Sequence, residues 1–333
     1  MDYGLIAKEV AKAANRALGS IIAKSKAYGG LPYSCFTKLF NSLVKPIIDY
    51  SAGVWGFKGY SCINAVYYRA CRYFLGVGKY TPNVAVLCEM GWDSPLQAQW
   101  HCLVKQWFRM CNMNDNRLCK RVFQWATQIS NNKKNWVYHV KQHFNEIGMA
   151  HLANISYTFT DENLSDFDMV MRERNEDDCF ARINATGSVV PGRGGNKLRL
   201  YKKLKHDITG TEAYVKLAMG KKHRSAYAKF RCGVAPLNIE LGRYRQSPVE
   251  QRLCPMCDTN NVEDESHVLL VCPLYNDIRN SLYDAIVLKH PDFNELNNDD
   301  KIILILSSED CIKDTAKACA DILFRRRCFM YAI

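Results

Sequence analysis

The sequence lacks the features that place a chain in a membrane or outside the cell. No apolar run approaches the roughly 20 residues that a membrane-spanning helix needs. The N-terminal segment carries charges throughout and contains no apolar signal-peptide core. We therefore expect no membrane partner and no secretion, and an intracellular location in the nucleus, the cytoplasm or both.

Strand patterns are also weak, and the sequence contains no internal repeat. Hydrophobic residues make up 48% of the chain and aromatic residues 11%, which is a globular composition and excludes a disordered tail. The 333 residues can bury a sizeable core in about two or three domains.

Cysteine, by contrast, is abundant, with 15 residues in the chain. Reducing conditions inside the cell keep them mostly as thiols, and the odd number agrees with this interpretation. Some have no metal-ligand residues nearby in the sequence, and we interpret them as small core residues. These are Cys35, Cys71, Cys102 and Cys319.

Apolar residues recur at helical spacing along most of the chain. Residues 33–50 carry one apolar stripe, and another follows Ser94 and Pro95, which are favoured as the N-cap and first residue of a helix. A shorter helix after Pro82 is expected to end near Gly91. Further helices are predicted at residues 3–27, 61–76, 117–129, 133–146, 165–184, 196–207, 211–219, 221–231, 273–288 and 309–330.

Positive charge is concentrated in one stretch. The chain has a formal net charge of +12, and residues 191–252 hold 15 Lys and Arg against four acids, a net of +11. Residues 161–180 hold eight acids against two Arg, a net of −6. A basic stretch beside a Cys/His cluster is typical of nucleic-acid-binding proteins, and the alternative is a solvated helical surface.

Residues 189–197, VVPGRGGNK, combine one Pro with three Gly and predict a linker between the acidic and the basic stretch. The segment lacks the full glycine spacing and the preceding strand of a phosphate-binding loop.

A Cys/His cluster follows in the segment CPMCDTNNVEDESHVLLVC. Its metal ligands would be Cys254, Cys257, His267 and Cys272. The first two cysteines form a turn in which both sulfurs face one point, and a short helix over 264–272 can bring the histidine and the last cysteine to the same side. We expect one structural Zn²⁺, because four protein ligands leave no position for a catalytic water. Arg252 beside the cluster would favour the thiolates. The spacing does not fit a retroviral zinc knuckle, a DNA-reading finger or a RING module.

These residues resemble a known family. The ordered elements KFRCGVAPLNIELGRYRQ, RLCPMC, EDESH and CPLY look like the C-terminal zinc-binding segment of reverse transcriptases from non-long-terminal-repeat (LINE-type) retrotransposons. KLFNSLVKPIIDYSAGVWG and RACRYFLGVGKYTPNVAVLCEMGW resemble elements that follow the polymerase palm, usually called the thumb. KIILILSS and ILFRRRCF resemble the closing helices. The resemblance covers most of the chain, most strongly 33–110 and 196–333, and implies the same four zinc ligands.

The palm of that family is missing from this sequence. A polymerase of this type needs aspartates that hold two Mg²⁺ ions. Asp177 and Asp178 lie in a polar helical stretch, and Asp299 and Asp300 lie at a loop and helix start. In that family, the palm, the fingers and an N-terminal endonuclease would precede residue 1. Some relatives place a nuclease after the zinc segment, but Asp292 of this chain lacks the further acid and lysine of such a site. We therefore expect no catalysis by this chain, and an upstream polymerase palm as a partner in the parent enzyme.

His139 and His143 are four residues apart and could share a metal on one helix face. No third ligand lies nearby, and Val140 follows the first histidine where a zinc protease has Glu, so we interpret both as surface or half-buried imidazoles. The tyrosines and tryptophans are interpreted as core residues rather than base-stacking platforms.

The sequence thus predicts a mostly α-helical protein, with a helical thumb and connector bundle followed by a small CCHC zinc module packed with C-terminal helices. The segments are thumb-like helices at 1–92, a connector with an acidic helix at 93–188, and basic helices, zinc module and closing helices at 189–333. We predict non-catalytic binding of RNA or DNA, without strong sequence preference. The residues expected to contact it are Lys197, Arg199, Lys202, Lys203, Lys205, Lys221, Lys222, Arg224, Lys229 and Arg231. The alternatives are a helical protein-interaction module stabilised by zinc, and an inert remnant of a decayed element.

Overall fold

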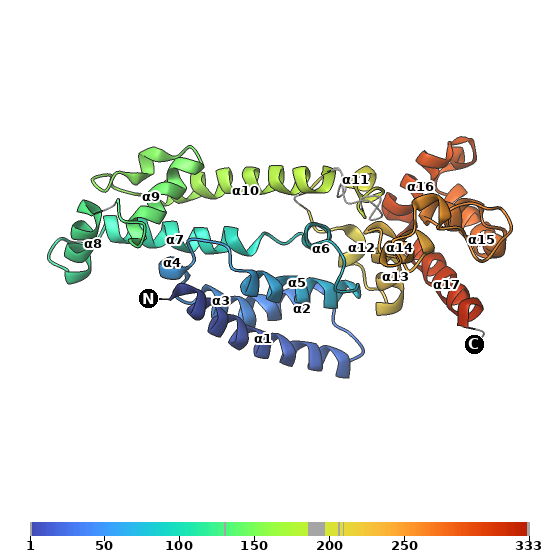
Figure 1. Cartoon of the computed structure of the whole chain (residues 1–333), viewed down its shortest axis with the longest axis horizontal. Helices are drawn as coiled ribbons and strands as arrows, with labels where there is room; N and C mark the ends of the chain where they lie inside the picture. Colours follow the sequence, from blue (N-terminus) through green and yellow to red (C-terminus); the bar gives the residue numbers. More distant parts are fainter. Residues whose placement is uncertain (1, 130, 186–196, 206, 209, 332–333) are drawn as a thin grey trace. The chain divides into compact units, whose positions relative to one another are not determined.

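A computed structural model describes residues 2–129, 131–185, 197–205, 207–208 and 210–331, and Figure 1 labels its helices. The predicted linker at 189–197 lies outside these ranges except for its last residue. The fold is mostly α-helical, as the apolar periodicity predicts. The described residues form no strand, and Leu253 and Val262 make one isolated antiparallel bridge. None of the described helices is both long and apolar enough to cross a membrane.

The chain divides into two compact units, each made of discontinuous segments. Unit 1 comprises Met1–Lys24, Phe36–Tyr68 and Asp93–Asp178, and unit 2 comprises Ser25–Cys35, Arg69–Trp92 and Cys179–Ile333. The division into three consecutive segments stays a prediction.

Unit 1 contains, wholly or in part, α1 (Tyr3–Ala27), α2 (Tyr33–Leu39), η1 (Phe40–Val44), α3 (Lys45–Asp49), α4 (Ala52–Trp55), α5 (Ser61–Leu75), α7 (Pro95–Cys111), α8 (Leu118–Gln128), α9 (Trp136–Glu146), η2 (Ala150–Ala153) and α10 (Asp161–Asn184). Its core contains the fully buried rings of Trp107, Phe144 and Phe167. The short helix α4 packs closely against α7, because a Cβ on Gly53 would lie only 2.8 Å from the carbonyl oxygen of Cys102.

Unit 2 contains α6 (Asn83–Met90), α11 (Tyr201–Leu204), α12 (Ala213–Lys216), α13 (Lys221–Arg231), α14 (Asn238–Tyr244), η3 (Val249–Gln251), η4 (His267–Val271), η5 (Pro273–Tyr275), α15 (Asn276–Val287), η6 (Pro291–Glu295), α16 (Asn298–Ser307), η7 (Glu309–Cys311) and α17 (Ile312–Tyr331). Helices α13 and α17 lie side by side and form its most extensive helix pair (Figure 1). Tyr227 of α13 donates its hydroxyl hydrogen bond to the carbonyl of Leu306 at the end of α16, at 2.9 Å.

Several predicted helix ends are confirmed by local chemistry. The hydroxyl of Ser94 accepts a hydrogen bond from the backbone N–H of Gln97 at 3.3 Å, so it caps α7, which begins at Pro95. Helix α6 ends where Gly91 adopts a left-handed conformation with φ of 60°.

Other helix predictions are wrong in detail. Residues 33–50 do not form one α-helix, because the five-residue π-helix η1 interrupts the stripe before α3. Pro46 has no backbone N–H and disfavours a regular helical turn before it, which gives a physical reason for the interruption. The helix predicted at 211–219 is only the single turn α12, between Gly210 and Gly220, which do not favour helix extension.

The interpretation of the isolated cysteines as core residues holds only in part. Cys71 and Cys319 are buried, and burial raises the pKa of both thiols, which makes them unreactive. Cys102 is partly exposed, and Cys35 is exposed on α2, so the interpretation is wrong for Cys35.

Candidate metal centre

The four predicted ligands, Cys254, Cys257, His267 and Cys272, converge in unit 2. Their ligand atoms all lie within 4.8 Å of one another. Cys254 Sγ lies 4.0 Å from Cys272 Sγ, and Cys257 Sγ lies 3.4 Å from Nε2 of His267. Zinc–sulfur bonds of about 2.3 Å in a tetrahedron place two sulfurs about 3.8 Å apart, so this donor set fits one tetrahedral ion.

A short hairpin presents the first two cysteines. The Leu253–Val262 bridge lies at its base, and the backbone N–H of Cys254 donates to the carbonyl of Asn261 at 2.8 Å. Asn260 in the turn has φ of 52°, a left-handed conformation that asparagine tolerates better than most residues. The hairpin leaves Cys254 buried and Cys257 partly buried, with both sulfurs at the same centre.

A π-helical turn, η4, presents the other two ligands. The backbone N–H of Cys272 donates to the carbonyl of His267 at 2.8 Å, a bond between residues five apart. This wider turn brings the two side chains to one side. Asp264 accepts a hydrogen bond from the backbone N–H of His267 at 2.8 Å, which caps the start of this turn. The sequence predicted a short helix here but not its π-helical geometry.

The four candidate ligands differ in how readily they lose a proton. Burial raises the pKa of the Cys254 and Cys272 thiols. Burial also opposes ionisation of Cys257, but hydrogen bonding from Thr259, whose hydroxyl lies 3.1 Å away, outweighs it and lowers the pKa of that thiol. Burial lowers the pKa of His267 and so favours the neutral imidazole that metals bind. A bound cation would deprotonate all three thiols.

A buried ion pair joins the hairpin to α17. Arg326 donates from Nε and Nη2 to the two carboxylate oxygens of Glu263, at 2.6 and 2.7 Å. Glu263 is 0% exposed and also accepts from the backbone N–H of Asn238 at 2.7 Å, at the start of α14. One carboxylate therefore connects the hairpin, α14 and α17. The sequence gives no signal for this pair, because its members lie 63 residues apart.

The expected role of Arg252 is wrong. Its guanidinium donates to the backbone carbonyls of Ser247 and Ile239, at 2.7–3.0 Å, rather than to the sulfurs. Its side chain packs over Gly242 of α14, where a Cβ would lie 2.5 Å from Cγ of the arginine. Arg252 therefore positions the hairpin on α14.

Three of the ten predicted nucleic-acid-binding cations are buried, which corrects their assignment as surface contacts. Arg231 donates to both oxygens of Glu89, at 3.0 and 3.1 Å, and to Glu212 at 2.6 Å. Lys205 pairs with the other oxygen of Glu212, and Arg224 donates to a backbone carbonyl at 3.0 Å. These side chains satisfy charges inside unit 2 and cannot reach a phosphate backbone on its surface.

Three more of these cations form ion pairs with acids that lie far away in the sequence. The pairs are Lys197 with Glu240 at 2.6 Å, Arg199 with Glu265, and Lys203 with Asp299 at 2.9 Å. Part of the net charge of +11 in the basic stretch is therefore neutralised by Glu265 and Asp299, which lie outside it. The remaining cations are the exposed Lys202, Lys221 and Lys222 and the partly buried Lys229.

Two of these remaining lysines line a groove of about 480 Å³ between α13, α14 and α17. Its charged lining is Lys222, Lys229, Arg326 and Arg327, and no described residue that lines it is a carboxylate. Lys222 Nζ and Arg327 Cζ lie 5.4 and 5.6 Å from the ring centroid of Phe324, which is 50% exposed. Sequence reasoning missed Arg327 and Phe324, because they belong to α17, which begins at Ile312, well after the basic stretch ends.

The other groups considered from the sequence do not join a metal site. Among the described residues, the Cys/His group is the one cluster of three or more potential metal ligands. His139 and His143 lie in unit 1 and pack against the rings of Phe57 and Trp100. His143 is more deeply buried than the sequence indicated, at 4% exposure.

Comparisons with protein-family models, with curated proteins and with solved structures give no match for this chain. The resemblance to LINE-type reverse transcriptases therefore stays a prediction that rests on the sequence elements quoted above.

Proposed function

We propose that this chain binds one structural Zn²⁺ and uses the helices around it to bind RNA or DNA without catalysis. The zinc ligands would be the three cysteines and His267. The ion would neutralise the thiolates and fix the hairpin against η4, and the four protein ligands would leave no open position for a reacting water.

The observation that carries the nucleic-acid proposal is the composition of the groove between α13, α14 and α17. Lys222, Lys229 and Arg327 line the same groove, and no described residue that lines it is a carboxylate, so an anion would relieve the repulsion among them. Burial lowers the pKa of Lys229, and a neighbouring phosphate would counter that shift. Phe324 and Tyr331, which are 50% and 71% exposed, offer rings for base stacking. This combination of phosphate contacts and rings suits a single strand without base-specific contacts.

Metal analysis of the chain purified under reducing conditions tests the zinc site. We expect one zinc per chain, lost in Cys254→Ser and in Cys257→Ser and kept in Cys119→Ser, an exposed cysteine outside the cluster. A wild-type chain that contains no zinc and takes up none when it is added would contradict the proposal.

Salt-dependent binding of a single-stranded oligonucleotide tests the groove. The triple variant Lys222→Ala, Lys229→Ala, Arg327→Ala should weaken binding to all sequences alike. It should also reduce the log–log salt slope by about 2, because each phosphate contact on a single strand contributes about 0.7. The matched control is Lys313→Ala, Lys317→Ala, Arg245→Ala, which removes the same charge from exposed positions outside the groove.

Equal loss of affinity in both triple variants would show that net charge alone, and not the groove, attracts the strand. A zinc-loaded wild-type chain without affinity for RNA or DNA at low salt would reject nucleic-acid binding altogether.

A second candidate function, a helical protein-interaction module, is favoured by one feature of unit 1. Helix α8 exposes an apolar stripe made of Leu118, Val122 and Trp125, which are 73%, 53% and 60% exposed. Exposed apolar stripes of this kind are common at protein interfaces. Absence of oligonucleotide binding together with self-association that depends on these residues would favour this second function.

A further inference from the structure

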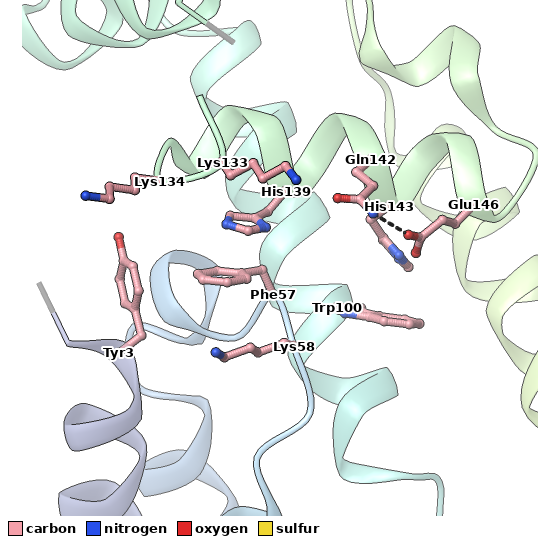
Figure 2. A pocket seen from close by; sticks show the side chains of 10 residues that line it. All are labelled: Tyr3, Phe57, Lys58, Trp100, Lys133, Lys134, His139, Gln142, His143 and Glu146. Carbon is pink, nitrogen blue, oxygen red and sulfur yellow. Dashed lines mark hydrogen bonds between the residues drawn. The ribbon is translucent and has the colours of Figure 1, made fainter. Parts of the chain in front are cut away.

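A second cavity, in unit 1, has the composition of a small-molecule site. It has a volume of about 700 Å³, within the range typical of ligand pockets. Figure 2 shows that its side chains come from α1, α7, α9, the segment after α4 and the residues before α9.

Aromatic rings line this cavity in two close pairs, one stacked and one tilted. Phe57 and His139 stack with centroids 4.1 Å apart and an interplanar angle of 10°. Trp100 and His143 lie 3.8 Å apart at 41°, and Tyr3 meets the ring of Phe57 edge-on at 5.1 Å. Such rings give a planar ligand a large apolar contact area.

The ring nitrogens beside the cavity lack hydrogen-bond partners. Nε1 of Trp100 and both ring nitrogens of His143 are buried, and none of them has a partner among the described residues. Buried polar atoms are normally hydrogen-bonded. Three such atoms on two neighbouring rings leave polar groups that a ligand with polar atoms of its own could satisfy.

The charged side chains separate along the cavity. Lys58 and Lys134 extend toward Tyr3 at one end in Figure 2, with Lys133 above the ring of His139. At the opposite end lie Gln142 and Glu146, whose side chains share a hydrogen bond of 2.8 Å. A ligand that matches this arrangement is anionic at one end and planar, with hydrogen-bond donors, at the other.

We propose that this cavity binds a nucleotide whose base carries an exocyclic amino group. The phosphate lies among Lys58, Lys133 and Lys134, the base lies against Trp100, and Glu146 accepts the hydrogen bond of the amino group. A free nucleotide and the 5′-terminal nucleotide of a strand share this chemistry. The proposal does not depend on the groove of unit 2, because the cavity and the groove have no residue in common.

Calorimetric titration of the zinc-loaded full chain with AMP tests the proposal. The double variant Lys58→Ala, Lys134→Ala removes two lysines that line the cavity. It should weaken AMP binding about tenfold or more, because charge-assisted hydrogen bonds are among the stronger polar contacts. Trp100→Phe keeps a ring but removes Nε1–H, and it should also weaken binding. UMP, which lacks the amino group, and inorganic phosphate should bind more weakly than AMP.

The control variant Lys8→Ala, Lys105→Ala removes two exposed lysines of unit 1 that do not line the cavity, and it should bind AMP like the wild type.

A 5′-phosphorylated oligonucleotide, titrated into the groove triple variant, distinguishes the two sources of the ligand. Residual binding that disappears with Lys58→Ala, Lys134→Ala assigns the cavity to a strand end, and AMP binding alone assigns it to a free nucleotide. If neither probe binds, or if binding is unchanged by both the lysine and the tryptophan variants, the proposal is overturned, whether or not the groove binds nucleic acid.

Discussion

At the residue scale, Glu263 joins the hairpin that carries Cys254 and Cys257 to α14 and α17. Removing one partner of a buried ion pair leaves the other charge without compensation in the interior, which typically costs about 3–5 kcal/mol. We therefore expect Glu263→Ala to lower the free energy of unfolding of unit 2 by about that amount, as measured by urea denaturation with zinc bound.

The neighbouring Arg325 provides a control for this prediction. It pairs with the exposed Asp277 at 2.5 and 2.7 Å, and solvent screens such a pair, so Arg325→Ala should change stability little. The double variant Glu263→Leu, Arg326→Leu should cost less than Glu263→Ala, because it leaves no uncompensated charge. Equal effects of Glu263→Ala and Arg325→Ala would show that the pair contributes nothing specific.

A second residue-scale prediction concerns His143. Burial lowers its pKa from 6.5 to about 4 in the folded chain, and Arg174 adds to this effect. As the pH falls, the unfolded chain therefore binds a proton at this histidine before the folded chain does. The free energy of unfolding keeps its full value above about pH 6.5 and decreases as the pH falls towards 4. His143→Phe should make the stability of unit 1 less sensitive to acid in this window, by about 3 kcal/mol at most.

Urea unfolding of both chains at about pH 7 and pH 4.5, followed by tryptophan fluorescence, measures this difference. Acid also protonates the proposed metal ligands, so the informative quantity is the difference between the variant and the wild type. An identical pH dependence of the two chains would mean that His143 is not buried as described.

The residues that the sequence could predict are those whose chemistry is local. Cys254 and Cys257 are three residues apart, and His267 and Cys272 are five residues apart. These two spacings limit the geometry of the four ligands almost by themselves. Arg231 could not be interpreted in this way, because its partner Glu89 is 142 residues away and only the fold brings the carboxylate to it. A basic stretch therefore looks like a binding surface in the sequence even where its charges are used inside the protein.

At the element scale, α8 presents opposite environments on its two faces. Leu118 and Trp125 are exposed, whereas Phe123 on the same helix is 3% exposed and meets the ring of Trp107 edge-on. Leu118→Lys and Trp125→Lys should each change the stability of unit 1 by about 0.5 kcal/mol or less, because both side chains are mostly exposed. Phe123→Ala should cost about 3–5 kcal/mol, because it opens a cavity in the core.

Urea denaturation of the three variants measures the contrast. If Trp125→Lys destabilised the chain as much as Phe123→Ala, the stripe would be covered in solution, by a second copy of the chain or by another part of it.

The helices themselves show which signals in the sequence are sufficient. Ser94 and Pro95 fixed the start of α7, because capping depends on adjacent residues. The π-helix after α2 could not be predicted from the apolar stripe, since the stripe continues through it and only the backbone hydrogen bonds change. The 3.6-residue pattern therefore predicts which face is buried more reliably than it predicts regular geometry.

At the scale of the whole molecule, the metal should stabilise one unit and not the other. All four ligands lie in unit 2, and Glu263 and Arg252 connect their hairpin to α14 and α17. Structural zinc contributes about 10–16 kcal/mol of apparent binding free energy near neutral pH, which is as much as the whole stability of an ordinary domain. Chelation under reducing conditions should therefore unfold at least residues 250–275, and with them the contacts of α17.

Hydrogen exchange followed by mass spectrometry, before and after chelation, tests this prediction. Amides of the hairpin, η4, α14 and α17 should lose protection, while those of α7 and α9 should keep it, because the core around Trp107 contains none of the four proposed metal ligands. Returning zinc should restore protection in the wild type but not in Cys257→Ser, and Cys119→Ser should behave like the wild type. Loss of protection throughout both units would show that the chain unfolds as one cooperative body, and unchanged exchange everywhere would show that the four ligands do not depend on a metal.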